Sequence, residues 1–487
     1  MNEKELSKEQ LEELEKFGAN SWFVEYLLNQ YNENPDQLPD QWKEYFGYDP
    51  SEKGSTKIDS SKGKSEPEKI ITKKIFEQPK PSKQDELKII AGSSARVLDN
   101  MTSSLSIPTA TSQRVIPVKL LEENRIIINN HLQKIGGGKI SYTHLIAYAI
   151  VMSLKKFPVM NNAFTESNGK PYIIKRKNVN IGIAVDVLKK DGSRSLIVPN
   201  IKNVDELNFR QFISTYEDLI KRTRSGQIDP EEFQGTTVTL TNPGTIGTVT
   251  SIPRLMMGQG LIIATGAIQY PAEYLAMSPD TISTLGISKV ITITSTYDHR
   301  IIQGAESGMF LKEINDLLLG SSNFYDTIFK DLNIPLKPTL WQTDIQPQGF
   351  NNGSNVDDIE KQARVLQLIN MYRVRGHLTA NINPLATNIA FHEELDPSFH
   401  RLTLWDLDRT FITGGFGGIR TATLRQILGK LQRTYCEKIG VEYMHIQNPI
   451  EKAWMQQKME PSENNPKLSE VQKKQITKKL IEAENFE

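Results

Sequence analysis

The 487-residue sequence predicts an α/β sandwich over residues 89–335, with helical segments before and after it. Three observations favour this fold class. Strand-like runs follow one another through the block, amphipathic helical patterns alternate with them, and polar segments poor in large apolar residues bound the block on both sides. Strands and helices mixed in this way pack in layers, with the helices against the sheet.

The N-terminal segment, residues 1–48, carries one amphipathic helix, SWFVEYLLNQYNENP, with Ser21 as its expected N-cap. Phe23, Leu27 and Tyr31 fall on one face of this helix. A single helix this short is marginal in water. We therefore expect it to dock, and on a partner or a neighbouring subunit rather than on its own chain.

Two segments have the composition of linkers. Residues 49–88 are rich in Lys, Ser, Glu and Pro, and they cannot bury enough apolar surface to offset the entropy lost on ordering, so we predict a disordered linker. Acidic residues interleaved with its lysines argue against nucleic-acid binding. Residues 336–358 are polar and rich in Asn and Gly, which predicts a second linker. Helical patterning returns over residues 359–487.

The large block contains both kinds of periodicity. A turn at Asp191-Gly192 separates its first two strand-like runs and predicts a hairpin. The strand-like runs are NVNIGIAVDVL, SLIVPNI, TVTLTN, GLIIATGAI and KVITITSTYDH. Two helical faces are predicted, one made of Phe209, Phe212, Ile213, Tyr216, Leu219 and Ile220, and one of Phe310, Ile314, Leu317 and Leu318.

Composition excludes several classes of function. Lys plus Arg number 58 and Asp plus Glu number 58, so a formal net charge of zero argues against nucleic acid or an anionic membrane as a partner. The single cysteine, Cys436, permits neither an intrachain disulfide nor a multi-thiolate zinc site. We expect no metal site, no signal peptide and no membrane-spanning helix, and a cytoplasmic location.

Two glycine-rich segments imitate nucleotide-binding motifs. GGGKIS at 136–141 places Ile140 where a phosphate loop needs Ser or Thr to reach magnesium. GGFGG at 414–418 lacks both a preceding strand and the dinucleotide spacing. We interpret both as turns.

One histidine lies where chemistry is expected. In STYDHRIIQGAESG (295–308), His299 ends a strand-like run, flanked by Asp298 and Arg300. Such a histidine can serve as a general base because its ordinary pKa lies near neutrality, although a purely structural role is the alternative. A second strand, in TVTLTNPGTIGT (237–248), breaks into a Pro-Gly turn with several hydroxyls, and a hydroxyl there can donate to an oxyanion.

These motifs carry a family resemblance. YDHRIIQGA resembles the D-H-R-x-x-D-G-A signature of the dihydrolipoyl acyltransferases, the E2 components of 2-oxoacid dehydrogenase complexes, and TLTNPGTIGT is similar to their T-I-T-N/S-x-G-x-x-G segment. The resemblance implies a two-layer fold like that of chloramphenicol acetyltransferase. It also implies trimers with active sites between subunits, so that His299, the base, and Thr241, the oxyanion donor, come from different chains.

The same resemblance assigns supporting positions. The family usually has Asp where this chain has Gln303, a change that puts in doubt the rate and the rigidity of the loop more than the role of His299. Asp298 and Arg300 are expected to support the histidine. Ser195 and Lys202, at either end of the strand-like run SLIVPNI, are expected to line the coenzyme A channel.

The flanking segments resemble the E1 component of 2-oxoglutarate dehydrogenase. The N-terminal helix and RVLQLINMYRVRGHLTANINPL (364–385) carry this resemblance, and the order E1, E2 core, E1 is that of the fused actinobacterial-type enzymes. It implies succinyl transfer from lipoamide to coenzyme A. Thiamine diphosphate and Mg2+ are implied only for a further E1 part, because we find no G-D-G motif in this chain.

Partners follow from the same resemblance, which implies a homotrimer or a higher homo-oligomer. We find no lipoyl motif, which implies that a separate lipoyl-bearing E2 protein supplies lipoamide and that dihydrolipoamide dehydrogenase (E3) reoxidises it. The alternative is a weakly active or inactive E2-like scaffold that trimerises and organises E1 chains. A trimer without affinity for coenzyme A would favour the scaffold.

Overall fold

The computed structural model describes six stretches of the chain and the four isolated positions Ser82, Asp85, Leu87 and Ile89. The stretches are residues 21–33, 38–46, 93–188, 194–344, 356–383 and 391–486. The predicted linker at 49–88 lies almost wholly outside the described residues, and so do residues 345–355 of the second linker.

A mixed six-stranded sheet forms the centre of the large domain, in the order β1-β10-β9-β8-β4-β7. Strands β1, β10 and β9 pair antiparallel, β9, β8 and β4 run parallel, and β7 closes the far edge antiparallel to β4. The bounds are β1 (Thr109–Pro117), β4 (Ile181–Ile183), β7 (Asn200–Ile201), β8 (Val238–Thr241), β9 (Leu261–Thr265) and β10 (Val290–Asp298).

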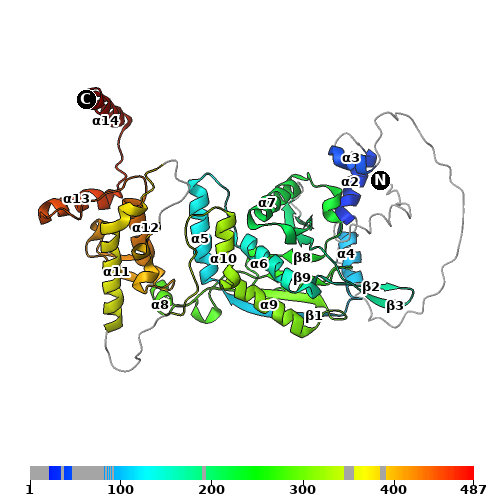
Figure 1. Cartoon of the computed structure of the whole chain (residues 1–487). Helices are drawn as coiled ribbons and strands as arrows, with labels where there is room; N and C mark the ends of the chain where they lie inside the picture. The colour runs from blue at the N-terminus through cyan, green and yellow to red at the C-terminus, as the bar shows by residue number, and fades with distance from the viewer. Residues whose placement is uncertain are drawn as a thin grey trace, which may run out of the picture.

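Helices lie against this sheet, and α6 and α9 lie next to each other (Figure 1). Both predicted helical faces are buried or partly buried, in α7 and in α9. The helices of the domain are α4 (Ser93–Ser104), α5 (Lys119–Lys134), α6 (Tyr142–Lys156), α7 (Phe209–Ser225), α8 (Pro279–Thr284), α9 (Gly304–Leu318) and α10 (Phe324–Asp331). The predicted α/β class is confirmed.

Strand β10 shows why the sheet has two different faces. Successive side chains of a strand point to opposite sides, so Ile293 joins the apolar core and Ser295 hydrogen-bonds Ser307 of α9 at 2.9 Å. Between them, Thr294 donates to the carbonyl of Ser251 at 2.7 Å. The second face is thus polar at Thr294, and the loop that follows β8 covers it there.

Two hairpins extend from the domain. Strands β2 (Ala163–Ser167) and β3 (Lys170–Ile174) form one, and β5 (Val185–Leu188) and β6 (Arg194–Ile197) form the other. The second is the hairpin predicted around Asp191-Gly192, although the turn itself lies outside the described residues.

The N-terminal helices α2 (Ser21–Glu33) and α3 (Asp40–Tyr45) dock on the large domain of their own chain. Trp42 is fully buried, and its indole N–H donates to the carbonyl of Ile228 at 2.7 Å. The ring of Phe23 lies 5.5 Å from that of Phe233. The predicted apolar face is therefore real, but the expectation that it docks on a partner is wrong, because aromatic residues of the same chain bury it.

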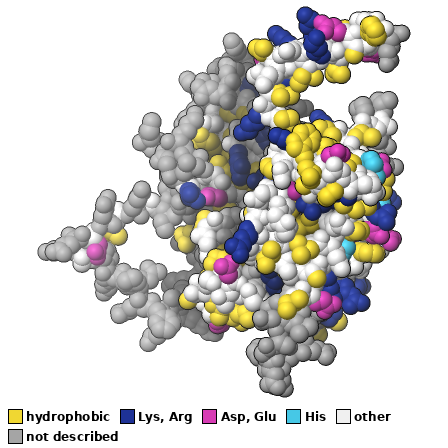
Figure 2. All heavy atoms as spheres, turned by 90° about the vertical axis from the view of Figure 1, so that its left-hand side faces the viewer, with side chains coloured by type: hydrophobic (Ala, Val, Ile, Leu, Met, Phe, Trp, Pro, Cys, Tyr) yellow, Lys and Arg dark blue, Asp and Glu magenta, His cyan; other side chains and the backbone are white. Residues whose placement is uncertain are grey.

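The C-terminal segment has a separate hydrophobic core and is largely helical, as predicted. Its helices are α11 (Val356–Arg375), α12 (Leu424–Tyr435), α13 (Pro449–Ser462) and α14 (Glu470–Glu484), and its short strands are β11 (Thr410–Ile412) and β12 (Thr421–Thr423). The glycines at 414–418 form the turn between these strands, and Gly417 donates its N–H to Glu460 at 3.1 Å. In Figure 2, which faces this segment, charged side chains of both signs and hydrophobic side chains are interspersed.

Candidate active site

His299 directly follows β10, in the turn that leads to α9. Its backbone N–H donates to the carbonyl of Pro108 at 2.9 Å. Its ring Nδ1 lies 3.1 Å from the carbonyl oxygen of Ile302, and because a carbonyl can only accept, Nδ1 carries the proton. The lone pair is then on Nε2, and the side chain is exposed. In the neutral form of the ring, this arrangement leaves Nε2 able to accept a proton.

The residues on either side of His299 form an ion pair, whose carboxylate is buried and whose guanidinium is partly exposed. Asp298 is 2% exposed, and both its oxygens accept from Arg300, at 2.9 Å from Nε and 2.6 Å from Nη2. The guanidinium also stacks on Phe164 of β2, 3.7 Å from the ring centre. The hydrogen bonds that Arg300 donates to Asp298, together with the charge of that carboxylate, raise the pKa of Arg300 above its ordinary value. The pair fixes the turn that carries the histidine.

Gln303 lies at the start of α9, outside the Asp298–Arg300 pair. It is exposed, it occupies the N-cap position of α9, and its backbone N–H donates to Glu306 at 2.7 Å. The charged brace of the turn is the Asp298–Arg300 pair, which does not involve residue 303. Sequence reasoning missed the contacts of Ile302 and Phe164; Phe164 lies within a segment quoted for the resemblance, but nothing there indicated a stacked arginine.

Thr241 is the last residue of β8, and a tight turn follows it. Gly244 in that turn permits a close approach, because a Cβ there would lie 2.2 Å from the carbonyl oxygen of Gly266. Asn242 donates to the hydroxyl of Thr143 on α6 at 2.8 Å, which holds the turn against the helices. Thr241 is partly buried at the end of its strand.

The two predicted catalytic residues lie at opposite ends of the sheet. The N–H of Asp298, next to His299, donates to Gly260, just before β9, whereas Thr241 lies opposite Ala264 near the end of β9. These four residues of β9 separate the two positions by about 13 Å along the strand direction. One carbonyl group cannot contact both side chains of a single chain.

Ser195 and Lys202 are also far apart. Ser195 lies in β6, opposite Val187, in the hairpin that follows β4 at the Thr241 end of the sheet. Lys202 follows β7 at the other end, and its ammonium donates to the carbonyl of Gln234. Burial lowers the pKa of Lys202, against the opposing effect of Glu231 and Glu232. One chain does not bring the two predicted channel residues together.

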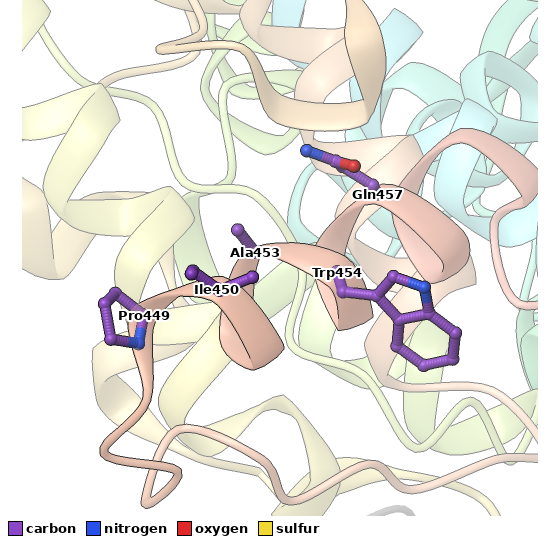
Figure 3. A pocket seen from close by; sticks show the side chains of 5 residues that line it. All are labelled: Pro449, Ile450, Ala453, Trp454 and Gln457. Atoms are coloured by element: carbon purple, nitrogen blue, oxygen red, sulfur yellow. The ribbon is translucent and has the colours of Figure 1, made fainter.

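Other parts of the described structure offer less chemistry. A pocket on α13 is lined by Pro449, Ile450, Ala453, Trp454 and Gln457, whose side chains lie along the helix in Figure 3, and none of them can act as an acid or base. Among the described residues, no group of three His, Cys, Asp or Glu side chains could hold a metal ion. No helix in the described stretches is both long enough and apolar enough to cross a membrane.

Comparison with known proteins identifies relatives over nearly the whole chain. The chain is 44% identical to the multifunctional 2-oxoglutarate metabolism enzyme of Mycolicibacterium vanbaalenii, over 97% of this chain and 41% of that protein. The chain thus spans about two fifths of the length of this curated relative.

Solved structures resemble a little under half of the chain. One is a truncated catalytic core of the 2-oxoacid dehydrogenase multienzyme complex from Thermoplasma acidophilum, with 25% identity, a TM-score of 0.40, and coverage of 48% of this chain and 98% of that one. Another is chloramphenicol acetyltransferase, with 12% identity, a TM-score of 0.28, and coverage of 45% of this chain and 94% of that one.

The family described as 2-oxoacid dehydrogenases acyltransferase (catalytic domain) matches residues 82–324. This range contains both His299 and Thr241, and it agrees with the resemblance seen in the two motifs. The resemblance to the fused 2-oxoglutarate enzymes agrees with the relative that spans nearly the whole chain. The chain therefore belongs, through its catalytic domain at residues 82–324, to the 2-oxoacid dehydrogenase acyltransferases.

Proposed function

We propose that the domain transfers a succinyl group from the thiol of dihydrolipoamide to coenzyme A. The observation that carries the proposal is the tautomer of His299, whose Nδ1–H donates to Ile302 and leaves the lone pair of Nε2 exposed. Succinyl is proposed because the full-length relative is named for 2-oxoglutarate metabolism. No residue of an acyl pocket contributes to this choice.

In the proposed reaction, Nε2 of His299 takes the proton of the coenzyme A thiol as the sulfur attacks the thioester carbonyl of succinyl-dihydrolipoamide. A carbon–sulfur bond forms, and the carbonyl oxygen becomes an oxyanion. When the intermediate collapses, the bond to the lipoyl sulfur breaks, and this sulfur takes the proton back from Nε2. Succinyl-coenzyme A and dihydrolipoamide leave, and His299 is neutral again.

Thr241 is proposed as the donor to the oxyanion. A preorganised donor at this position typically contributes about a hundredfold or more in rate. Because Thr241 and His299 lie at opposite ends of the sheet in one chain, we propose that each site joins His299 of one copy to Thr241 of another. A cyclic homotrimer satisfies this requirement for every copy.

The proposed partners lie outside this chain. A lipoyl-bearing E2 protein would present the acyl group, and dihydrolipoamide dehydrogenase would reoxidise the lipoyl thiols. Decarboxylation of 2-oxoglutarate, with thiamine diphosphate and Mg2+, is proposed only for the longer relatives. This chain spans 41% of the length of the Mycolicibacterium vanbaalenii protein. A cytoplasmic location remains a prediction.

The test is thiol exchange by the purified full chain. Succinyl-coenzyme A and free dihydrolipoamide are mixed, and the release of coenzyme A is followed for the wild type and for His299→Ala. Release by the wild type alone is expected, and acetyl-coenzyme A as donor shows whether succinyl is preferred. No release from a wild-type protein with a confirmed trimeric mass would contradict the proposal and favour the scaffold.

A further inference from the structure

Residues 336–344, predicted to begin a linker, instead bind both parts of the molecule. The fully buried side chain of Asn124 on α5 donates to the carbonyl of Thr339 at 3.0 Å and accepts from its N–H at 2.8 Å. Farther on, the indole N–H of Trp405 in the C-terminal segment donates to the carbonyl of Gln342 at 2.8 Å. The ring of Trp341 lies 5.6 Å from that of Trp405, edge to face. This stretch holds the C-terminal segment against α5.

A first ionic cluster connects α5 of the large domain with the C-terminal segment. Glu123 on α5 is 4% exposed, and its two oxygens accept from Arg425 of α12 at 2.6 Å each. Lys119 on α5 contacts both Glu123, at 3.0 Å, and Asp408 of the C-terminal segment, at 2.5 Å. Arg425 also donates to Asp408 at 2.9 Å. Two cations and two carboxylates thus alternate across the boundary.

A second cluster lies around Arg409. Its guanidinium donates to both oxygens of Asp344, at 3.0 and 2.7 Å, and to the carbonyls of Ser283 and Thr284 at the end of α8, at 3.2 and 2.8 Å. It also contacts Asp406, which has no exposed surface, at 2.7 Å. One arginine therefore joins the large domain, the connecting stretch and the C-terminal segment.

The burial of Glu123 in the first cluster and of Asp406 in the second explains why the arrangement is specific. A bidentate arginine–carboxylate pair fixes orientation as well as distance, and a buried charge that loses its partner is strongly destabilising. Burial by itself would raise the pKa of Asp408, but hydrogen bonds and charge from Arg425 and Lys119 lower it to about 2. Asp408 is therefore charged at neutral pH.

We propose that the face of the large domain formed by α5 and α8 is a docking surface for the C-terminal segment, so that the two unfold as one cooperative unit. A segment attached by a flexible linker would unfold independently. The inference does not depend on the acyl transfer proposed above.

The test is a double-mutant cycle in the full chain, read by differential scanning calorimetry. The wild type is expected to show one transition. Glu123→Gln and Arg425→Met are each expected to lower its Tm by about 5 °C, because each leaves a charged partner behind. The double variant is expected to lose clearly less than the sum of the two.

Glu437→Gln is the matched control. Glu437 of the C-terminal segment pairs with Lys134 of α5 at 3.1 Å, so this ion pair also connects the two parts of the molecule, but both of its side chains are exposed. This change is expected to shift the Tm by less than about 1 °C. If Glu123→Gln does not fold, Arg409→Met and Asp344→Asn supply an equivalent cycle. Two separate transitions in the wild type, or additive effects in the cycle that is measured, would overturn the proposal.

Discussion

The side chains at the two ends of the central sheet differ in whether they find interaction partners within the same chain. At the His299 end, the imidazole, the Asp298–Arg300 pair and the start of α9 all have partners within the chain. At the Thr241 end, no hydrogen-bond partner of the Thr241 hydroxyl is found among the described residues. The loop beyond it exposes Ile246 by 76% and Ile252 by 66%.

This difference fits the proposed site, in which two copies of the chain contribute different residues. The proposed proton acceptor, His299, has its partners in its own copy, whereas the proposed oxyanion donor, Thr241, lies beside an apolar loop that a neighbouring copy can cover. Substitutions at the first end should therefore act within one chain. Substitutions at the second should act on the site of a neighbour.

The largest effect on the rate is expected at the His299 end of the sheet. His299→Ala removes the proton acceptor and should lower kcat for thiol exchange by about a hundredfold to ten-thousandfold. The measurement is the release of coenzyme A at saturating succinyl-coenzyme A. A Tm within about 2 °C of the wild type would show that the loss is chemical, since His299 is exposed.

A somewhat smaller effect on the rate is expected at the Thr241 end of the sheet. Thr241→Val keeps the shape of the side chain but removes the hydroxyl, and should lower kcat by about a hundredfold to a thousandfold with little change in KM. Thr241→Ser keeps the hydroxyl and serves as the control. Equal losses in Val and Ser variants would rule against an oxyanion donor.

The brace should matter less than the groups that it positions. Arg300→Met breaks the pair with Asp298 and the stack on Phe164, and should lower kcat by about tenfold or more through misplacement of His299. Arg300→Lys should recover only part of this rate, because a lysine cannot make the bidentate contact. An unchanged kcat in Arg300→Met would show that the turn holds its shape without the pair.

The smallest effect is expected at the residue that departs from the family signature. Gln303 is exposed and outside the brace, so Gln303→Asp should change kcat by less than about threefold, and a better N-cap for α9 should raise stability slightly. Steady-state rates and Tm values of the two proteins test this. A tenfold gain in kcat would mean that an aspartate at this position does take part in supporting His299.

Sequence patterns predicted the elements of the fold because they depend on local periodicity. Periodicity predicted the apolar face of α7 and the strand that ends just before His299. The sequence motifs around His299 and Thr241 indicated these two residues as candidates for catalysis. Long-range pairings had no such signal. The stack of Arg300 on Phe164 joins two residues that lie far apart in the sequence. It depends on how a hairpin packs beside the turn.

The two predicted linkers show the same limit. Composition alone cannot distinguish a polar stretch that stays in solvent from one that binds through its backbone. Thr339 and Gln342 are bound through main-chain groups, which every residue possesses, so their side chains gave no indication of it. Likewise the amphipathic helix α2 revealed an apolar face but not its partner, which is Phe233 and its neighbours in the same chain.

The most direct test of the central claim mixes two inactive chains. His299→Ala and Thr241→Val proteins are combined in equal amounts, unfolded and refolded together, or co-expressed with different tags, and thiol exchange is measured. If each site joins His299 of one copy to Thr241 of the next, random trimers should regain about one quarter of the wild-type activity, because one in four interfaces pairs the two intact residues. Activity no higher than that of the separate variants, in trimers shown to contain both chains, would contradict a site shared between copies.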